Sequence, residues 1–192
     1  MKKLSIILLA LLIVFSFSSC EKDKTEDVIS AYENYYKVSA IDNNAYNLFS
    51  SSLNEDTDSL DLTPAAVDMA TLRTLLKSLG LSDESLGESI TPSGKITGTI
   101  KKRNKNLTFD VKISYTVADG AKELTITGTY FNEQGDTGTG PATARSTSYA
   151  LKINGTDYAV SCKIDENGKC TSASVNGTDV DVRLINSGKK IK

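Results

Sequence analysis

The second half of the chain alternates apolar and polar residues with a period of two, and this pattern limits the fold more than any other feature. In residues 107–117 every second side chain is apolar, and the side chains between them are Thr, Asp, Lys and Ser. Successive side chains of a β-strand point to opposite faces, so this segment forms a strand with one buried and one solvated face. Further segments follow the same rule and start at Lys95, Leu124, Tyr149, Tyr158 and Val180.

Four dipeptides between these segments predict tight turns. They are Asp119-Gly120, Asn154-Gly155, Asn167-Gly168 and Asn176-Gly177. Asn-Gly and Asp-Gly adopt the positive φ angles that two-residue hairpin turns require, and they are the strongest short-range hairpin signals. The region 95–185 is therefore expected to form an antiparallel meander of about seven strands with a single apolar face.

Residues 28–80 carry helical patterns instead. In Thr63–Gly80, Thr63 is placed to cap the N-terminus, a proline follows at the first helical position, and Gly80 can close the C-terminus. Its apolar face consists of Ala65, Met69, Leu72, Leu75, Leu76 and Leu79. Residues 28–53 carry a second, drifting apolar stripe, which Asp42-Asn43-Asn44 can interrupt.

These two halves predict one domain of the α+β class, residues 28–192. A long sheet twists and tends to curl, and its single apolar face must be covered. We expect the N-terminal amphipathic helices to pack on a curved antiparallel β-meander. The alternative is a closed up-and-down barrel with the helices outside.

The first twenty residues have the layout of a secretory signal. Lys2 and Lys3 precede an apolar stretch from Leu4 to Phe17, and Ser18, Ser19 and Cys20 form a small-residue processing site. The apolar stretch reaches only about 21 Å as a helix, less than the roughly 30 Å of a hydrocarbon core, so it is not a permanent membrane span.

Ser18, Ser19 and Cys20 resemble the lipobox of bacterial lipoproteins, although Phe17 departs from the usual Leu, Val or Ile. The resemblance covers residues 1–20 only. It implies removal of residues 1–19 and a diacylglyceryl thioether on Cys20, with two or three acyl chains that anchor the protein to a membrane. The expected location is the bacterial cell envelope, outside the cytoplasm, at the outer membrane or cell surface. The alternative is a soluble secreted protein cut after Ser18.

Residues 20–27 then form a charged tether between the lipid and the domain. Without residues 1–19 the chain keeps 20 basic and 24 acidic residues, a balance that argues against a nucleic-acid partner. The chain has no histidine, the commonest general base and zinc ligand. Asp56 and Asp58 fit no EF-hand, because Leu60 and Asp61 occupy the fifth and sixth positions. We therefore expect no enzymatic activity, metal or cofactor.

Cys162 and Cys170 are candidates for a disulfide in an exported chain. A three-residue loop, Glu166–Gly168, would place Ile164 opposite Cys170 and Cys162 diagonally on the same face, where a bridge can form. A two-residue turn, Asn167-Gly168, would place the cysteines on opposite faces and forbid it. The alternative to the disulfide is a pair of buried thiols.

Four tyrosines lie on the apolar face of the middle strands. With alternating strand direction, Tyr130 and Tyr149 are expected at one end of the sheet, and Tyr115 and Tyr158 at the other. They form a candidate rim for a ligand cavity. The alternative is that they pack at the edge of the core and keep their hydroxyls in water.

The segment 132–143 is the longest connection within the sheet and is the candidate binding loop. Its candidate contact residues are Asn132, Glu133, Asp136 and Thr137. Asp136-Thr137-Gly138 resembles the triplet of aspartic proteases, but no apolar strand precedes it and the triplet occurs only once. The sequence thus favours a membrane-anchored, non-enzymatic binding or surface-interaction domain with an unknown protein partner. The alternative is a carrier of a small apolar ligand within the curved sheet.

Overall fold

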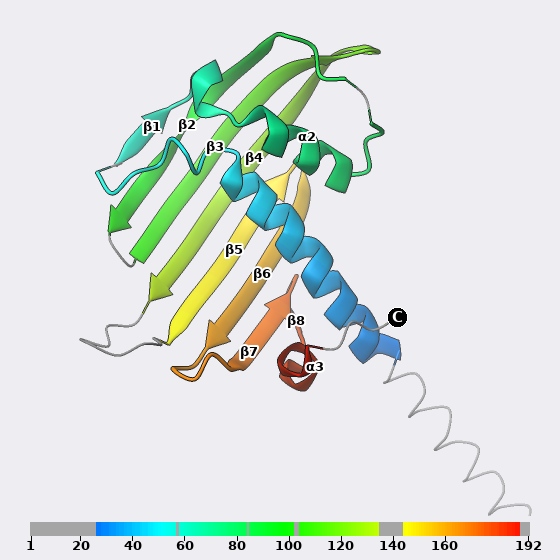
Figure 1. Cartoon of the computed structure of the whole chain (residues 1–192), viewed down its shortest axis with the longest axis vertical. Coiled ribbons are helices and arrows are strands. Elements are labelled where there is room, and N and C mark those ends of the chain that lie inside the picture. The colour runs from blue at the N-terminus through cyan, green and yellow to red at the C-terminus, as the bar shows by residue number, and fades with distance from the viewer. Residues whose placement is uncertain (1–25, 57, 84, 102–103, 135–143, 189–192) are drawn as a thin grey trace, which may run out of the picture.

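The fold is an open antiparallel sheet with helices on one face (Figure 1). The computed structural model describes residues 26–56, 58–83, 85–101, 104–134 and 144–188. Within these ranges eight strands lie side by side in the order in which they occur in the chain. The predicted α+β class is confirmed. The alternative of a closed barrel is wrong, because the first and last strands are at opposite edges and do not pair with each other.

The strands differ strongly in length. Two short strands at the edges flank six longer ones, and their bounds are β1 (Ser59–Asp61), β2 (Ile90–Lys101), β3 (Asn104–Val117), β4 (Gly120–Gln134), β5 (Arg145–Ile153), β6 (Thr156–Ile164), β7 (Cys170–Val175) and β8 (Thr178–Asp179). The strand expected through Val180, Val182 and Leu184 is wrong, because β8 ends at Asp179 and α3 (Val182–Ser187) follows it. The Asp181 side chain accepts a hydrogen bond from the Arg183 N–H at the start of α3, and Gly188 ends it with φ of 61°.

The helical half contains one long helix and two shorter elements. Residues 26–47 are helical without a break at Asp42-Asn43-Asn44. The predicted helix Thr63–Gly80 is divided into a 3-10 turn, η1 (Pro64–Ala66), and α2 (Met69–Ser78). Thr63 makes no side-chain capping bond, whereas the Asp68 carboxylate accepts a 2.6 Å hydrogen bond from the Thr71 N–H and caps α2. None of the described helices is long and apolar enough to cross a membrane.

The helices and the inner face of the sheet enclose two hydrophobic clusters. The large core joins the second half of helix 26–47 and α2 to β2–β5, and it includes Ile41, Leu48, Phe49, Leu72, Leu75, Ile96, Phe109, Leu124 and Ile126. The small core joins the first half of helix 26–47 to β6 and β7, and it consists of Tyr32, Tyr35, Val38, Val160, Cys170, Ala173, Val175 and Val180. Helix 26–47 therefore crosses the sheet diagonally and contributes to both (Figure 1). Met69, expected on the buried face of α2, is 38% exposed.

Glycine allows the long strands to approach closely at three points, Gly94, Gly98 and Gly128. Gly98 in β2 and Gly128 in β4 have φ of 138° and 118°, which side chains rarely adopt. A Cβ at Gly98 would collide with the carbonyl oxygen of Asn106, and one at Gly128 with that of Ala150. These positions therefore require glycine.

Candidate functional site

Two of the predicted rim tyrosines meet at one end of the sheet. Tyr130 and Tyr149 are paired across β4 and β5, and their ring centroids are 4.6 Å apart. Tyr46 of helix 26–47 stacks on Tyr130 at the same distance. The Tyr149 hydroxyl donates a 2.8 Å hydrogen bond to Asn43 Oδ1, and Lys105 Nζ donates a 2.7 Å bond to the Tyr46 hydroxyl. Burial raises the pKa of Tyr130 to about 12. The rings of Tyr46, Tyr130 and Tyr149 therefore pack directly against one another at this end of the sheet.

The other two tyrosines lie apart from this stack. Tyr115 is 4% exposed and borders a void of about 10 Å³ beside Leu76 and Leu81, too small for any ligand larger than a single water. Tyr158 is half-buried and contacts both the large and the small core. On the inner face of the sheet, the apolar side of α2 packs in the space where the alternative of a ligand carrier would place its cavity.

Next to the tyrosine stack, helix 26–47 buries a carboxyl group. Asp42 is fully buried, and neither of its oxygens has a hydrogen-bond partner among the described residues. The Ser39 hydroxyl, one turn earlier, is also buried and has no hydrogen-bond partner in the described part of the chain. Removal from water raises the pKa of Asp42 to about 8. The sequence indicated only that the helix can be interrupted at Asp42. The position of Asp42 between the apolar residues Val38 and Ala45 was a signal that the carboxyl group could be buried.

The structure describes only the first part of the candidate binding loop. Asn132 accepts a 2.9 Å hydrogen bond from the Thr147 hydroxyl across the end of the sheet. Glu133 lines a hollow of about 390 Å³ together with Arg145, Lys163 and other residues. The candidate residues Asp136 and Thr137 lie outside the described residues.

The outer face of the sheet, which points away from the helices, has side chains in cross-strand rows. Strand register aligns small residues in one row, which runs through Ser59, Thr97, Thr108, Thr129, Ala150 and Ala159. The neighbouring row runs through Asp61, Lys95, Asp110, Thr127, Lys152 and Asp157, and its charges nearly alternate. All of these side chains are exposed or half-exposed.

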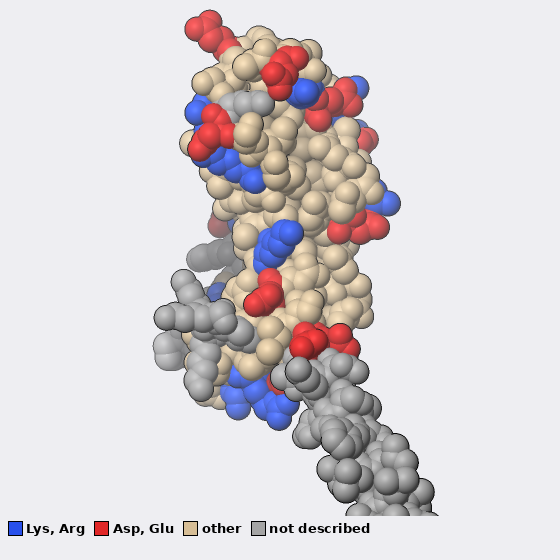
Figure 2. All heavy atoms as spheres, turned by 90° about the vertical axis from the view of Figure 1, so that its right-hand side faces the viewer, with Lys and Arg blue, Asp and Glu red and all other residues tan. Residues whose placement is uncertain are grey.

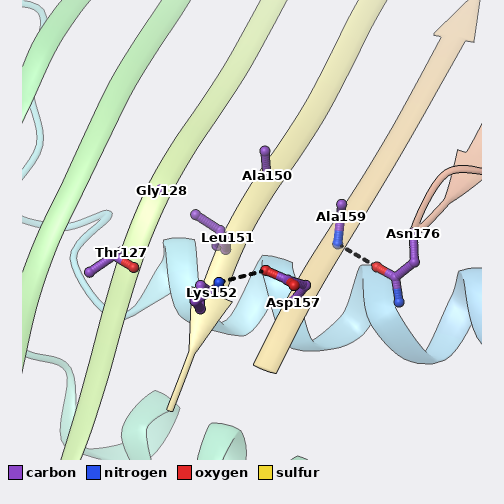
Figure 3. Close-up of a pocket in the computed structure, with 8 residues that line it drawn as sticks. All are labelled: Thr127, Gly128, Ala150, Leu151, Lys152, Asp157, Ala159 and Asn176. Carbon is purple, nitrogen blue, oxygen red and sulfur yellow. Dashed lines mark hydrogen bonds and ion pairs between the residues drawn. The ribbon is translucent and has the colours of Figure 1, made fainter. Parts of the chain in front are cut away.

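A broad hollow of about 640 Å³ lies where these two rows cross β4, β5 and β6 (Figure 3). Ala150 and Ala159 are paired across β5 and β6, and their short side chains form the floor of the hollow. The rim is polar, because Lys152 and Asp157 form a 3.4 Å ion pair beside them. Asn176 is fixed at the far side by a 2.9 Å hydrogen bond that its Oδ1 accepts from the Ala159 N–H.

A narrower cleft opens on the helix side, where the two cores meet. Its volume is about 370 Å³, and it lies between helix 26–47, the C-terminal end of α2 and the start of β6. Its lining combines apolar with polar side chains, among them Lys37, Val38, Ile41, Leu79 and Tyr158. A small apolar floor with a few polar groups is typical of ligand sites.

Both edges of the sheet are partly covered. β1 pairs with the middle of β2, from Lys95 to Thr97. At the other edge the Asn186 side chain of α3 accepts a hydrogen bond from the Cys170 N–H at 2.8 Å and donates one to the Cys170 carbonyl at 2.9 Å. Such covering blocks the addition of a further strand, so the edges are poorer docking surfaces than the outer face.

The two cysteines lie close together without an S–S bond. Their sulfur atoms are 3.8 Å apart. The register places Ile164 opposite Cys170, with a shift between Lys163 and Ile164. This is the arrangement that permits a bridge, and the disulfide itself stays a prediction.

Among the described residues no three Cys, Asp or Glu side chains are grouped so that they could hold a metal ion. Those residues include the loop around Asp56 and Asp58 but not every acid of the chain. No protein-family model, no curated protein and no solved structure matches the chain.

Proposed function

We propose that the protein is a membrane-anchored extracytoplasmic lipoprotein, and that its domain binds a protein partner through the outer face of the sheet. The lipobox-like Ser18, Ser19 and Cys20 support the anchor. The observation that carries the binding role is the outer face of the sheet, on which the described side chains are exposed or half-exposed around a central hollow, while helices cover the other face.

The outer face is large enough for a specific interface. The five long strands β2–β6 have 12, 14, 15, 9 and 9 residues. At about 4.8 Å between strands and 3.3 Å per residue, the 59 residues of these five strands cover roughly 900 Å². A stable protein–protein interface takes about 800 Å² from each partner. The hollow of small side chains offers a place for a protruding side chain of the partner.

The charges favour a protein partner over nucleic acid. On the side of the molecule in Figure 2, basic and acidic side chains are interspersed, and neither sign dominates a large area. The alternating row on the outer face has the same character. Alternating charges set the register and orientation of a partner more than they add affinity.

A non-enzymatic role is supported by the available titratable groups. The chain contains no histidine. Of the acids in the described residues, Asp42 has the most strongly raised pKa, but its side chain is fully buried and no substrate can reach it. A general acid or base must come within hydrogen-bond distance of the proton that it transfers.

Site-specific photo-crosslinking in intact cells tests this function. A benzophenone amino acid at Thr129, on the outer face, is expected to give an adduct of one defined mass. The same probe at Thr74, exposed on α2, is the matched control and should give none. Ala150→Arg fills the hollow and should abolish the Thr129 adduct while the circular dichroism spectrum stays unchanged. Cys20→Ser should release the domain from the membrane fraction. Adducts of equal yield at both positions, or none at Thr129, would contradict the proposal.

The second candidate is carriage of a small apolar ligand, and the cleft of about 370 Å³ beside helix 26–47 favours it. In this case a native mass spectrum of the protein from its own membranes should show extra mass that is absent after denaturation. Leu79→Trp would fill the cleft and remove the extra mass, whereas Thr74→Trp would not. A native mass equal to that of the acylated chain from Cys20 leaves the outer face as the binding surface.

A further inference from the structure

The pair Cys162 and Cys170 has a geometry that no part of the proposed function uses. The two sulfur atoms are 3.8 Å apart on adjacent strands, whereas a disulfide bond is about 2.05 Å long. An approach of less than 2 Å therefore separates the two states. The register shift between Lys163 and Ile164 lies inside the same hairpin. A bulge of this kind bends one strand locally, so the hairpin can absorb the approach.

The two thiols differ in access. Cys170 is 5% exposed and belongs to the small core, whereas Cys162 is half-buried. Burial raises the pKa of the Cys170 thiol, and the neighbouring Cys162 sulfur raises it further. The thiolate is the attacking species in disulfide exchange, and it must reach its target. Cys162 is therefore suited to the first attack and Cys170 to the second, which takes place inside the protein.

Helix 26–47 packs directly against these two cysteines. The Tyr35 hydroxyl forms a hydrogen bond with the Cys162 sulfur, and Tyr32, Tyr35 and Cys170 pack in the same small core. The Cys170 sulfur also donates to the Ser172 carbonyl at 3.4 Å. A movement of the two sulfur atoms would therefore alter the packing of the first half of helix 26–47, the part that follows the tether in the chain.

We propose that Cys162 and Cys170 form an oxidation site that exchanges with a low-molecular-weight disulfide such as oxidised glutathione. The Cys162 thiolate attacks one sulfur of the small disulfide, whose S–S bond breaks and releases one thiolate. The Cys170 thiolate then attacks the Cys162 sulfur of this mixed disulfide and releases the second thiolate. Two electrons pass from the cysteine pair to the small disulfide, and the two thiol protons end on the two released thiols.

The resulting bond joins β6 to β7 underneath helix 26–47. It closes a short loop and removes conformational freedom mainly from the unfolded chain. The bond constrains the small core, which is covered by helix 26–47 and the short α3 and not by α2. Oxidation after export therefore fixes the hairpin on which Tyr35 packs.

The test uses the full chain with Cys20→Ser, so that only this pair carries thiols. The reduced protein is incubated with oxidised glutathione and analysed by intact mass and alkylation. We expect a loss of about 2 Da, loss of both alkylation sites and a rise of about 5 °C in Tm. The Cys170→Ser variant should stop at a glutathione adduct on Cys162. The Cys162→Ser variant should form its adduct at least about tenfold more slowly, because Cys170 is buried.

Several results would overturn the assignment. One is a protein that keeps both alkylation sites while a small model dithiol in the same solution is oxidised. Another is an equal rate of adduct formation on the two single variants, which would remove the distinction between the attacking and the resolving thiol. Ser161→Cys in the Cys162→Ser background serves as the geometric control. Residue 161 points to the outer face, and its thiol should not form an intramolecular bond with Cys170.

Discussion

Replacement of Asp42 by asparagine is expected to stabilise the protein by roughly 4 kcal/mol at pH 7 and to leave it almost unchanged at pH 4. Asp42 is fully buried in helix 26–47, and its oxygens have no hydrogen-bond partner among the described residues. Burial raises its pKa from 3.8 to about 8. Asparagine has nearly the same shape and carries no charge at either pH, so the comparison isolates ionisation.

The direction follows from proton binding in the two states. Below pH 4 the carboxyl group is protonated in both the folded and the unfolded chain. Between pH 4 and pH 8 the unfolded chain has lost this proton and the folded chain keeps it. Each pH unit in this window therefore lowers the free energy of unfolding by about 1.4 kcal/mol relative to the asparagine variant. Tyr149 faces the same space, and the charge of Asp42 adds to the effect of burial in raising the pKa of Tyr149.

Urea unfolding between pH 4 and pH 9, followed by far-ultraviolet circular dichroism, measures this difference. The method suits a chain without tryptophan. Glu33→Gln removes a carboxylate from the exposed side of the same helix and is the matched control. Parallel pH profiles for the wild type and Asp42→Asn would show that the Asp42 carboxyl is ionised in the folded state and would refute the prediction.

The sheet was predictable because its inner and outer faces differ so strongly. In β3 the buried positions alternate without exception from Leu107 to Val117, as the sequence pattern predicted. The Asn-Gly turns were also predictable, since Asn154 and Asn176 adopt the positive φ angles of 49° and 48° that these turns require. Alternating strand direction also predicted that Tyr130 and Tyr149 lie at the same end of the sheet. Their direct pairing was not predictable, because a long connection and not a tight turn joins β4 to β5.

The helix boundaries were less predictable because several residues compete for the same role. Thr63 and Asp68 both precede a helical pattern, and the extended backbone of Val67 separates η1 from α2. Asp68 provides the cap. Near the C-terminus, Val180 and Val182 alternate like a strand, but the Asp181 cap starts a helix between them. A short apolar run does not distinguish these outcomes by periodicity alone.

The hollow on the outer face and the full burial of Asp42 were not predictable from the sequence. The hollow on the outer face arises from Ala150 and Ala159, which are adjacent only through strand register. Two alanines far apart in the sequence form no chemical motif, so no local sequence pattern predicts the hollow. The depth of Asp42 depends on how helix 26–47 lies across the sheet, because the position faces the sheet only in that orientation. Tertiary placement decides both features.

Phe49→Ala is expected to lower the free energy of unfolding by about 4 kcal/mol. Phe49 follows helix 26–47 and is fully buried against the sheet, with its ring centroid 6.3 Å from that of Phe109. Truncation removes a large apolar side chain and leaves a cavity that its neighbours cannot fill, since Phe109 is itself held in the pleat of β3. Urea unfolding at a single pH measures the loss.

Phe131→Ala is the matched control, and it also probes the proposed binding surface. Phe131 is a half-exposed residue of β4 on the outer face, opposite Ser148. Its truncation should cost about 1 kcal/mol or less, because a side chain already in contact with water loses little on removal. A loss as large as that of Phe49→Ala would mean that the outer face is buried against a second copy of the chain in solution. The face would then be a dimer interface, and a different surface would have to bind the partner.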